Sequence, residues 1–269
     1  MGRLDDAFAA AKAENRAAFI AYITAGDPTL ESTGRLMQAF EKSGVDIVEL
    51  GVPYSDPVAD GPVNQDAAMR ALKHDVHIRL IFDMVREVRK DSSLPVIFFM
   101  YYNSLLQYGI DSFVKDAAQA GVDGALVLDL PPEEAGEYKR LMDEAGLATV
   151  FLVSPITPNE RLKKITNLAT GFVYYVSQMG VTGERSETAG HIGEKVDAIR
   201  ELTDVPVAVG FGISKPEHVK EVAERADGVI VGSAIVHRIA EGCHEPGFEE
   251  KVAAYVQTLT APLKGARNG

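Results

Sequence analysis

Residues 45–62 read VDIVELGVPYSDPVADGP and contain the unit from which the fold is inferred. Val45 to Leu50 is an apolar run that predicts a buried strand. The Gly, Pro and Asp residues after it predict a loop, and a helix is expected to start at the Gly-Pro step. Glu49 at the strand tip and Asp60 before the Gly-Pro frame this loop. An ion pair for Glu49 and a helix cap by Asp60 are the structural alternatives to a functional pair.

The same unit recurs along the chain, and its repetition predicts the topology. The expected strands cover 19–23, 45–50, 96–100, 124–128, 148–153, 171–176, 205–209 and 228–231. The expected helices cover 3–15, 30–42, 63–72, 77–89, 110–120, 133–144, 158–167, 192–202, 215–225, 233–240 and 248–259. Strands that alternate with helices predict a parallel sheet, and continuous apolar strands predict one covered on both faces.

Eight such units in 269 residues fit one domain, a TIM (β/α)8 barrel over residues 1–269. We expect an extra N-terminal helix over the barrel floor and short extra helices after strands 2 and 8. The tail 264–269 is expected to be frayed. An open doubly wound sheet is the alternative, but the first strand is not followed by the glycine fingerprint of that fold.

Composition limits the classes of partner. A net charge of -12 does not provide the positive field that nucleic acids require. Cys243 is the one cysteine, so an internal disulfide is excluded and a reducing compartment is favoured. Neither CxxC nor HExxH occurs, so no metal site is predicted. No apolar run reaches the roughly 20 residues of a membrane span, and we expect a cytoplasmic protein.

The carboxyl ends of the strands predict the position of a binding site, because TIM barrels place their active sites there. Most side chains expected at this face are apolar or aromatic, which predicts a pocket for a flat apolar group with few polar contacts. Packing of single aromatics onto the barrel core is the alternative. The residues are Tyr22, Thr24, Glu49, Met100, Tyr102, Leu128, Asp129, Tyr174, Tyr175, Gly210 and Gly232.

Two glycine turns at the last two strands predict a phosphate site. Gly210 and Gly212 follow strand 7, and Gly232 follows strand 8. Glycine allows a ligand to approach the backbone, and Ser233 opens a short helix whose free N–H groups can bind an anion. Tight turns with an ordinary helix cap are the alternative.

The polar segment 177–190 has three glycines and exceeds the usual βα connection of about 2–6 residues. It predicts a mobile lid over the strand ends, with a passive surface loop as the alternative.

Together these motifs resemble the tryptophan synthase alpha chain family. The resemblance rests on ELGVPYSDPVADGP at 49–62, TAGDP at 24–28, GVTG at 180–183, GFGIS at 210–214 and GSAIV at 232–236. The motifs occur in the family's order and cover nearly the whole chain. The resemblance implies a TIM barrel that cleaves indole-3-glycerol phosphate into indole and glyceraldehyde 3-phosphate without metal or organic cofactor.

The resemblance also implies roles for individual residues. Glu49 would be the acid/base, Asp60 would bind the indole N–H, and Tyr174 would belong to the active site. Thr182 would be the lid residue that closes over Asp60. The phosphate site would comprise Gly183, Gly212, Gly232 and Ser233. The indole pocket would comprise Tyr22, Met100, Tyr102, Leu126, Leu128 and Phe211.

A pyridoxal-phosphate-bearing beta chain is the partner that the resemblance implies, in an alpha2beta2 heterotetramer. The loop 53–60 would contact this partner, with Asp56 as an ionic contact. Tyr22 and Asn64 depart from the family's common pattern, Phe and an aliphatic residue respectively, which leaves the detail of the pocket open. A freestanding lyase, a catalytically weak regulatory subunit and another phosphate-binding barrel enzyme remain alternatives.

The residues at the strand ends fit a retro-aldol cleavage. Glu49 at an apolar strand tip is predicted to have a raised pKa, which suits a group that gives and takes a proton. Asp60 would stabilise the positive charge that develops on the indole nitrogen. No lysine is expected at a strand end, so a Schiff-base mechanism lacks its residue.

Overall fold

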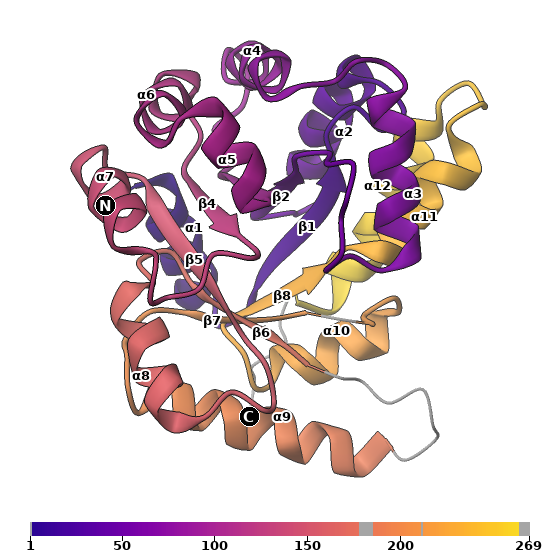
Figure 1. Cartoon of the computed structure of the whole chain (residues 1–269). Helices are drawn as coiled ribbons and strands as arrows, with labels where there is room; N and C mark the ends of the chain where they lie inside the picture. The colour runs from indigo at the N-terminus through magenta and orange to yellow at the C-terminus, as the bar shows by residue number, and fades with distance from the viewer. Residues whose placement is uncertain (1, 178–184, 211, 264–269) are drawn as a thin grey trace.

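The structure, a computed structural model, describes residues 2–177, 185–210 and 212–263, and gives only the secondary structure of residues 185–191. Eight parallel strands close a barrel in chain order, with β8 paired to β1 (Figure 1). The predicted TIM barrel is therefore confirmed. The strands are β1 (Ala18–Thr24), β2 (Ile47–Gly51), β3 (Val96–Met100), β4 (Gly124–Val127), β5 (Ala148–Val153), β6 (Val173–Val176), β7 (Val207–Gly210) and β8 (Gly228–Val231).

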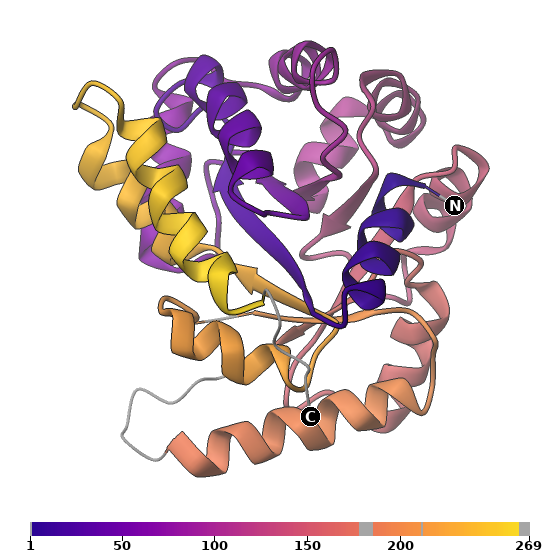
Figure 2. The same ribbon diagram turned by 180° about the vertical axis from the view of Figure 1, so that it is seen from behind.

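Helices surround the barrel on the outside (Figures 1 and 2). They are α1 (Arg3–Ala13), α2 (Leu30–Lys42), α3 (Pro62–Leu72), α4 (Ile78–Val88), α5 (Tyr102–Tyr108), α6 (Ile110–Ala120), α7 (Gly136–Glu144), α8 (Asn159–Leu168), α9 (Arg185–Arg200), α10 (Pro216–Ala223), α11 (Ser233–Gly242) and α12 (Phe248–Thr260), followed by a 3-10 turn at Ala261–Leu263. The predicted extra helices at the N-terminus and after β2 and β8 are present as α1, α3 and α11.

Two helices differ from the sequence prediction. The helix α5 was not predicted, because it is a short segment between the end of β3 and the glycine that precedes α6. The helix α9 begins at Arg185, not at Ile192. Residues 185–190 are RSETAG and lack the apolar periodicity that marks a helix in a sequence. The connection between β6 and α9 is therefore shorter than predicted, and residues 178–184 lie outside the described part.

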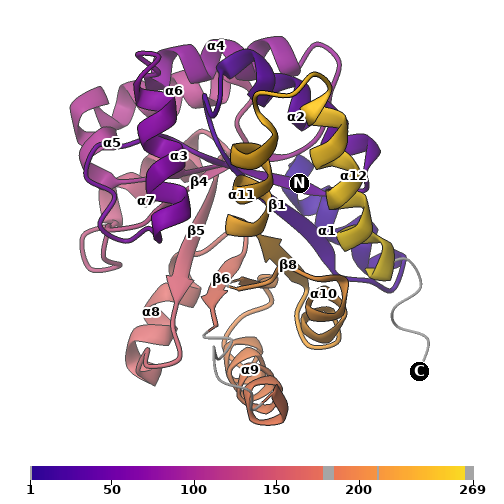
Figure 3. The same cartoon turned by 90° about the vertical axis from the view of Figure 1, so that its right-hand side faces the viewer.

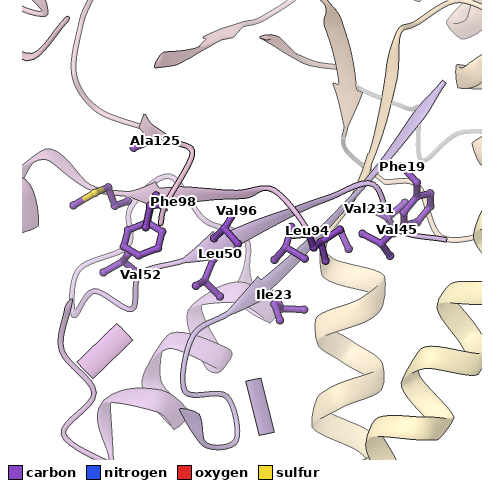
Figure 4. Packing of buried hydrophobic residues seen from close by; sticks show 14 of the residues in the cluster. Phe19, Ile23, Val45, Leu50, Val52, Leu94, Val96, Phe98, Ala125 and Val231 are labelled. Atoms are coloured by element: carbon purple, nitrogen blue, oxygen red, sulfur yellow. The ribbon is translucent and has the colours of Figure 1, made fainter. Parts of the chain in front are cut away.

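The barrel strands are buried on both faces, and each face packs against a different partner. Outward side chains such as Ile23, Leu50, Val96 and Phe98 pack in the larger core cluster shared with the surrounding helices (Figure 4). Inward side chains form a second cluster, in which α1 closes the N-terminal end of the barrel. The members of this inner cluster include Leu4, Phe8, Ala11, Ile20, Ile47, Ile97, Leu126, Val150, Phe172, Ala208 and Ile230. The expected role of the first helix as a cover of the barrel floor is confirmed.

Aspartates fix the N-terminal ends of alternate strand pairs. Each lies directly before an even-numbered strand, and its carboxylate accepts a hydrogen bond from a backbone N–H at the start of the preceding strand. The bonds run from Phe19 to Asp46 at 2.7 Å, from Val96 to Asp123 at 2.8 Å and from Val207 to Asp227 at 3.0 Å. Arginines from the preceding segments pair with the same carboxylates: Arg16 with Asp46, Arg89 with Asp123 and Arg200 with Asp227. This network fixes strand register far from the carboxyl ends.

In the three described segments, no helix combines the length and the apolar character needed to span a lipid bilayer.

Candidate active site

A cavity of about 620 Å³ opens at the carboxyl ends of the strands. Its wall combines a carboxylate pair, aromatic and aliphatic side chains, and the glycine turns after β7 and β8. Figure 3 shows α3 beside α11, the two helices that start at the cavity wall. The lining comprises Tyr22, Glu49, Ala59, Asp60, Gly61, Pro62, Val63, Asn64, Phe99, Leu128, Leu152, Val153, Ser154, Thr157, Tyr174, Val176, Gly212, Ile213, Ile230, Gly232 and Ser233.

Glu49 projects into this cavity from β2 and is only 1 % exposed. Burial, with a smaller contribution from the nearby charge of Asp60, raises the pKa of Glu49 to about 8. Its Oε1 atom has no hydrogen-bond partner among the described residues. A carboxyl in this state carries a proton at neutral pH and can donate it, and the predicted rise in pKa is confirmed.

Asp60 has a different environment, although it lines the same cavity. Its Oδ2 accepts a hydrogen bond of 2.9 Å from the Tyr101 hydroxyl, which itself accepts one of 3.0 Å from the Ala59 N–H. Gln65 donates to the Asp60 backbone carbonyl at 2.8 Å. Burial raises the pKa of Asp60, while Tyr101 and Asn64 act to lower it. The Tyr101 hydroxyl thus holds Asp60 in place and favours its anion, whereas Glu49 has no such donor among the described residues.

Two tyrosines complete the cavity wall, and each depends on a facing glycine. A Cβ atom at Gly51 would lie 2.4 Å from the Tyr22 hydroxyl, and one at Gly210 would lie 2.6 Å from the Tyr174 hydroxyl. Gly210 therefore makes room for the Tyr174 hydroxyl. The sequence predicts a different role for this glycine, which is to let a ligand approach the backbone. Burial, followed by the charge of Glu49, raises the pKa of Tyr174.

The Tyr22 ring packs edge-on against Phe99, with ring centroids 5.0 Å apart. This pair forms an apolar wall next to the carboxylates.

The expected phosphate end of the cavity is formed by Gly212, Gly232 and Ser233, which lie on its wall. Gly212 has a φ of 73°, a conformation that favours glycine. The helix α11 starts at Ser233, and the first N–H groups of a helix have no intrahelical partner. The structure thus brings together the donors that an anion needs. Thr182, Gly183 and Phe211 lie outside the described residues.

Three residues expected in the indole pocket do not line the cavity. Met100 is fully buried in the outer core cluster, because side chains alternate along β3 and its neighbour Phe99 faces inward. Tyr102 starts α5, and its N–H donates to Asp129 at 2.6 Å. Leu126 packs deeper, within the inner barrel cluster.

The sequence prediction missed Phe99, Leu152 and Tyr101. The strand β3 reads VIFFM, and a continuous apolar strand has no alternation from which its inward face can be read. Glu49 faces the barrel interior, and so does Gly51 two residues later. Gly51 pairs with Phe99 in the register of β2 with β3, so Phe99 also faces inward. This register is not evident from the sequence.

Within residues 2–177, 185–210 and 212–263, no group of three His, Cys, Asp or Glu side chains is arranged to hold a metal ion. The cofactor-free reaction implied by the resemblance stays a prediction.

Comparison with known proteins shows the family of this chain. The model of the family described as tryptophan synthase alpha chain matches residues 8–266. The alpha chain from Opitutus terrae is 49 % identical over 265 residues, covering 98 % of this chain and 100 % of that protein. The alpha chain from Geotalea daltonii is 47 % identical over 263 residues, covering 98 % and 99 %.

Solved structures show the same similarity. Tryptophan synthase subunit alpha from Legionella pneumophila superposes with a TM-score of 0.90 at 38 % identity, covering 98 % of this chain and 99 % of that one. A chain of ligand-free tryptophan synthase from M. tuberculosis gives a TM-score of 0.88 at 34 % identity, covering 98 % and 100 %. With a matching family model and relatives of this identity along nearly its full length, the chain belongs to the tryptophan synthase alpha chain family.

Proposed function

We propose that this chain is a carbon–carbon lyase that cleaves indole-3-glycerol phosphate into indole and glyceraldehyde 3-phosphate, as the alpha subunit of a tryptophan synthase. The observation that carries this proposal is the contrast between two carboxyls on one apolar cavity. Glu49 is buried with Oε1 unpartnered and has a pKa of about 8, whereas Asp60 accepts a hydrogen bond from Tyr101. Carboxyls whose environments separate their pKa values suit different acid and base roles.

The cavity matches the three parts of this substrate. Tyr22, Phe99, Leu128 and Leu152 provide apolar surface for a flat bicyclic ring. The turns at Gly212 and Gly232, with the start of α11, provide donors for a phosphate dianion. The two carboxyls lie on the same wall, where the bond between ring and glycerol carbon would be placed.

The proposed chemistry needs one proton donor and one anion. Glu49 donates its proton to C3 of the indole ring, and the positive charge that forms is shared by the ring nitrogen. Asp60, as an anion facing the ring N–H, stabilises that charge. The Glu49 carboxylate then takes the proton of the glycerol hydroxyl next to the breaking bond. The electron pair of the carbon–carbon bond returns to the ring, an aldehyde forms, and Glu49 regains its proton.

Tyr174 is proposed as a further active-site residue, because its half-buried ring lies close enough to Glu49 for the two groups to interact electrostatically. It narrows the space around the Glu49 carboxyl and keeps water away from it. Thr182 and Gly183 keep their proposed roles as lid and phosphate residues.

A tryptophan synthase beta chain that bears pyridoxal phosphate is the proposed partner, in an alpha2beta2 heterotetramer in the cytoplasm. Support comes from three large apolar side chains that are exposed and follow the carboxyl ends of strands: Val58 at 86 %, Leu106 at 51 % and Ile156 at 90 %. Val58 and Ile156 are next in sequence to Ala59 and Thr157, which line the cavity, and exposed apolar side chains gathered at one face favour a protein partner. Asp56, which is exposed in the same loop as Val58, is the proposed ionic contact.

The test is incubation of the purified chain with indole-3-glycerol phosphate and detection of indole, alone and with a beta chain. We expect indole release that depends on Glu49, so that Glu49→Gln folds normally and loses almost all turnover. Equal turnover with and without the beta chain would favour a freestanding lyase. Activation of the beta chain without indole release would favour a regulatory subunit. Near-native turnover of Glu49→Gln would remove Glu49 from the mechanism.

A further inference from the structure

The phosphate end of the cavity is formed by two segments that leave neighbouring strands. Gly212 lies in the turn after β7, and Ser233 starts α11 after β8. The pairing of β7 with β8 ends at Gly210 and Ile230. Both segments therefore lie beyond the paired residues, so strand pairing alone does not fix the distance between them.

Tyr255 of α12 contacts both segments from outside the barrel. Its hydroxyl donates a hydrogen bond of 2.8 Å to the backbone carbonyl of Ser214, two residues after Gly212. Its ring faces the guanidinium of Arg238 in α11, with 5.1 Å between the guanidinium carbon and the ring centre. Figure 3 shows α12 beside α11. The Tyr255 ring also packs against the outer core cluster, which fixes its place.

We propose that Tyr255 is a positioning residue for the phosphate end of the cavity. It holds the turn after β7 and α11 together, so that the backbone N–H groups of the two segments keep the arrangement that an anion needs. Tyr255 is not among the residues that line the cavity, so it acts through these segments and not by touching the substrate. The inference rests on the proposed function for the identity of the phosphate ester, and on the structure for the contacts.

The turn after β7 needs such support because its backbone is permissive. Gly212 has a φ of 73°, and glycine loses more conformational freedom than any other residue when it is ordered. The N–H of Ser214 makes only a long contact of 3.5 Å with Nδ1 of His218, and a hydrogen bond of that length is weak. The Tyr255 hydroxyl is therefore the stronger of these two contacts to Ser214. A turn that is ordered before the ligand arrives costs less to order on binding.

The expected effect is modest, because Ser214 is exposed and water can partly replace a lost hydroxyl. The lower part of the usual range for a neutral hydrogen bond corresponds to a change of about 2- to 5-fold in a dissociation constant.

The experiment measures the dissociation constants of inorganic phosphate and of indole, each added alone to the full chain. In Tyr255→Phe, which keeps the ring beside Arg238, the Kd of phosphate should rise about 2- to 5-fold while the Kd of indole stays unchanged. The KM for indole-3-glycerol phosphate should rise to the same extent at nearly constant kcat, because the lost contact supports ground state and transition state alike. Tyr255→Leu also removes the ring contact with Arg238 and should raise the Kd of phosphate further.

Tyr138→Phe is the matched control. The Tyr138 hydroxyl also donates to a backbone carbonyl, that of Ala125 at 3.0 Å, but it is buried and Tyr138 does not line the cavity. The control should lower the melting temperature at least as much as Tyr255→Phe and leave the Kd of phosphate at the wild-type value. An unchanged Kd of phosphate in Tyr255→Phe, an equal rise in Tyr138→Phe, or an equal weakening of indole binding overturns the inference.

Two further outcomes separate the parts of the argument. Equal effects of Tyr255→Phe and Tyr255→Leu would overturn the part of the inference that concerns α11. A wild type that binds no phosphate overturns the inference together with the phosphate end of the proposed function. A wild type that binds phosphate but releases no indole overturns the proposed function alone, because the Kd of phosphate in the variants still decides the role of Tyr255.

Discussion

The Tyr101 hydroxyl is the contact that ties the end of β3 to Asp60, and Tyr101→Phe removes only that oxygen. The hydroxyl donates to Asp60 Oδ2 at 2.9 Å and accepts from the Ala59 N–H at 3.0 Å. The Tyr101 side chain is 3 % exposed, and its ring packs against Tyr54 with centroids 5.1 Å apart. Phenylalanine keeps this packing, so the variant should fold as the wild type does.

The size of the effect follows from the bond that is lost. A hydrogen bond to a charged group contributes about 1.5–3 kcal/mol. Asp60 is half-buried, so water can partly replace the hydroxyl, and the lower end of that range applies. About 1.5 kcal/mol corresponds to a roughly tenfold lower kcat/KM. Because Tyr101 acts to lower the pKa of Asp60, its loss should also move the acidic limb of kcat/KM to higher pH.

The assay is the pH dependence of indole release by Tyr101→Phe, with Tyr102→Phe as the control. Tyr102 is adjacent in sequence but starts α5 and does not line the cavity, so its hydroxyl should be dispensable. A Tyr101→Phe enzyme within twofold of wild type, with an unmoved acidic limb, would refute the role given to this hydroxyl. A larger loss in Tyr102→Phe than in Tyr101→Phe would refute the assignment of side-chain direction at the end of β3.

Other predictions concern the remaining parts of the barrel. Activity of the wild type should fall above pH about 8 as Glu49 loses its proton, and pH profiles of kcat/KM would show this. The folded-state pKa of Glu49 is raised, so the protonated Glu49 contributes fully to stability below the unfolded-state pKa, and this contribution is lost as the pH rises to about 8. Glutamine does not titrate. Between these two pKa values, the unfolding free energy of Glu49→Gln should therefore gain about 1.4 kcal/mol relative to wild type for each pH unit. Gly210→Ala places a Cβ 2.6 Å from the Tyr174 hydroxyl and should lower kcat roughly 10- to 100-fold with little change in melting temperature. Asp123→Ala leaves Arg89, whose side chain is only 12 % exposed, without its carboxylate; it should cost roughly 3 kcal/mol in the free energy of unfolding by urea, with the cavity intact.

The fold was predictable because each strand is a continuous apolar run between a polar loop and a helical pattern. The bounds of α2, α6, β3, β5 and β8 match the sequence prediction. The start of α9 was not predictable, because residues 185–190 are polar and carry no apolar period. In the site, Glu49 and Asp60 are marked by their motif. The sequence does not show which of Phe99 and Met100 faces the cavity, because both side chains are apolar. Only the register of β3 with β2 decides it.

The two ends of the barrel differ in whether their shielded polar groups have partners, and this contrast is what allows the site to exist. At the N-terminal end, Asp46, Asp123 and Asp227 are each paired with an arginine and bonded to a backbone N–H. At the carboxyl end, Glu49 and Asn64 each have a buried oxygen with no partner among the described residues.

Unsatisfied polar atoms destabilise the fold where they lie, but they are also the atoms that can respond to a ligand. Pairing at the floor fixes strand register independently of the cavity. The carboxyl end can therefore hold a protonated Glu49 and an oriented Asp60 without also having to hold the barrel together. Substitutions at the floor should for this reason lower stability at nearly constant turnover, whereas removal of the unsatisfied groups at the cavity should lower turnover without lowering stability.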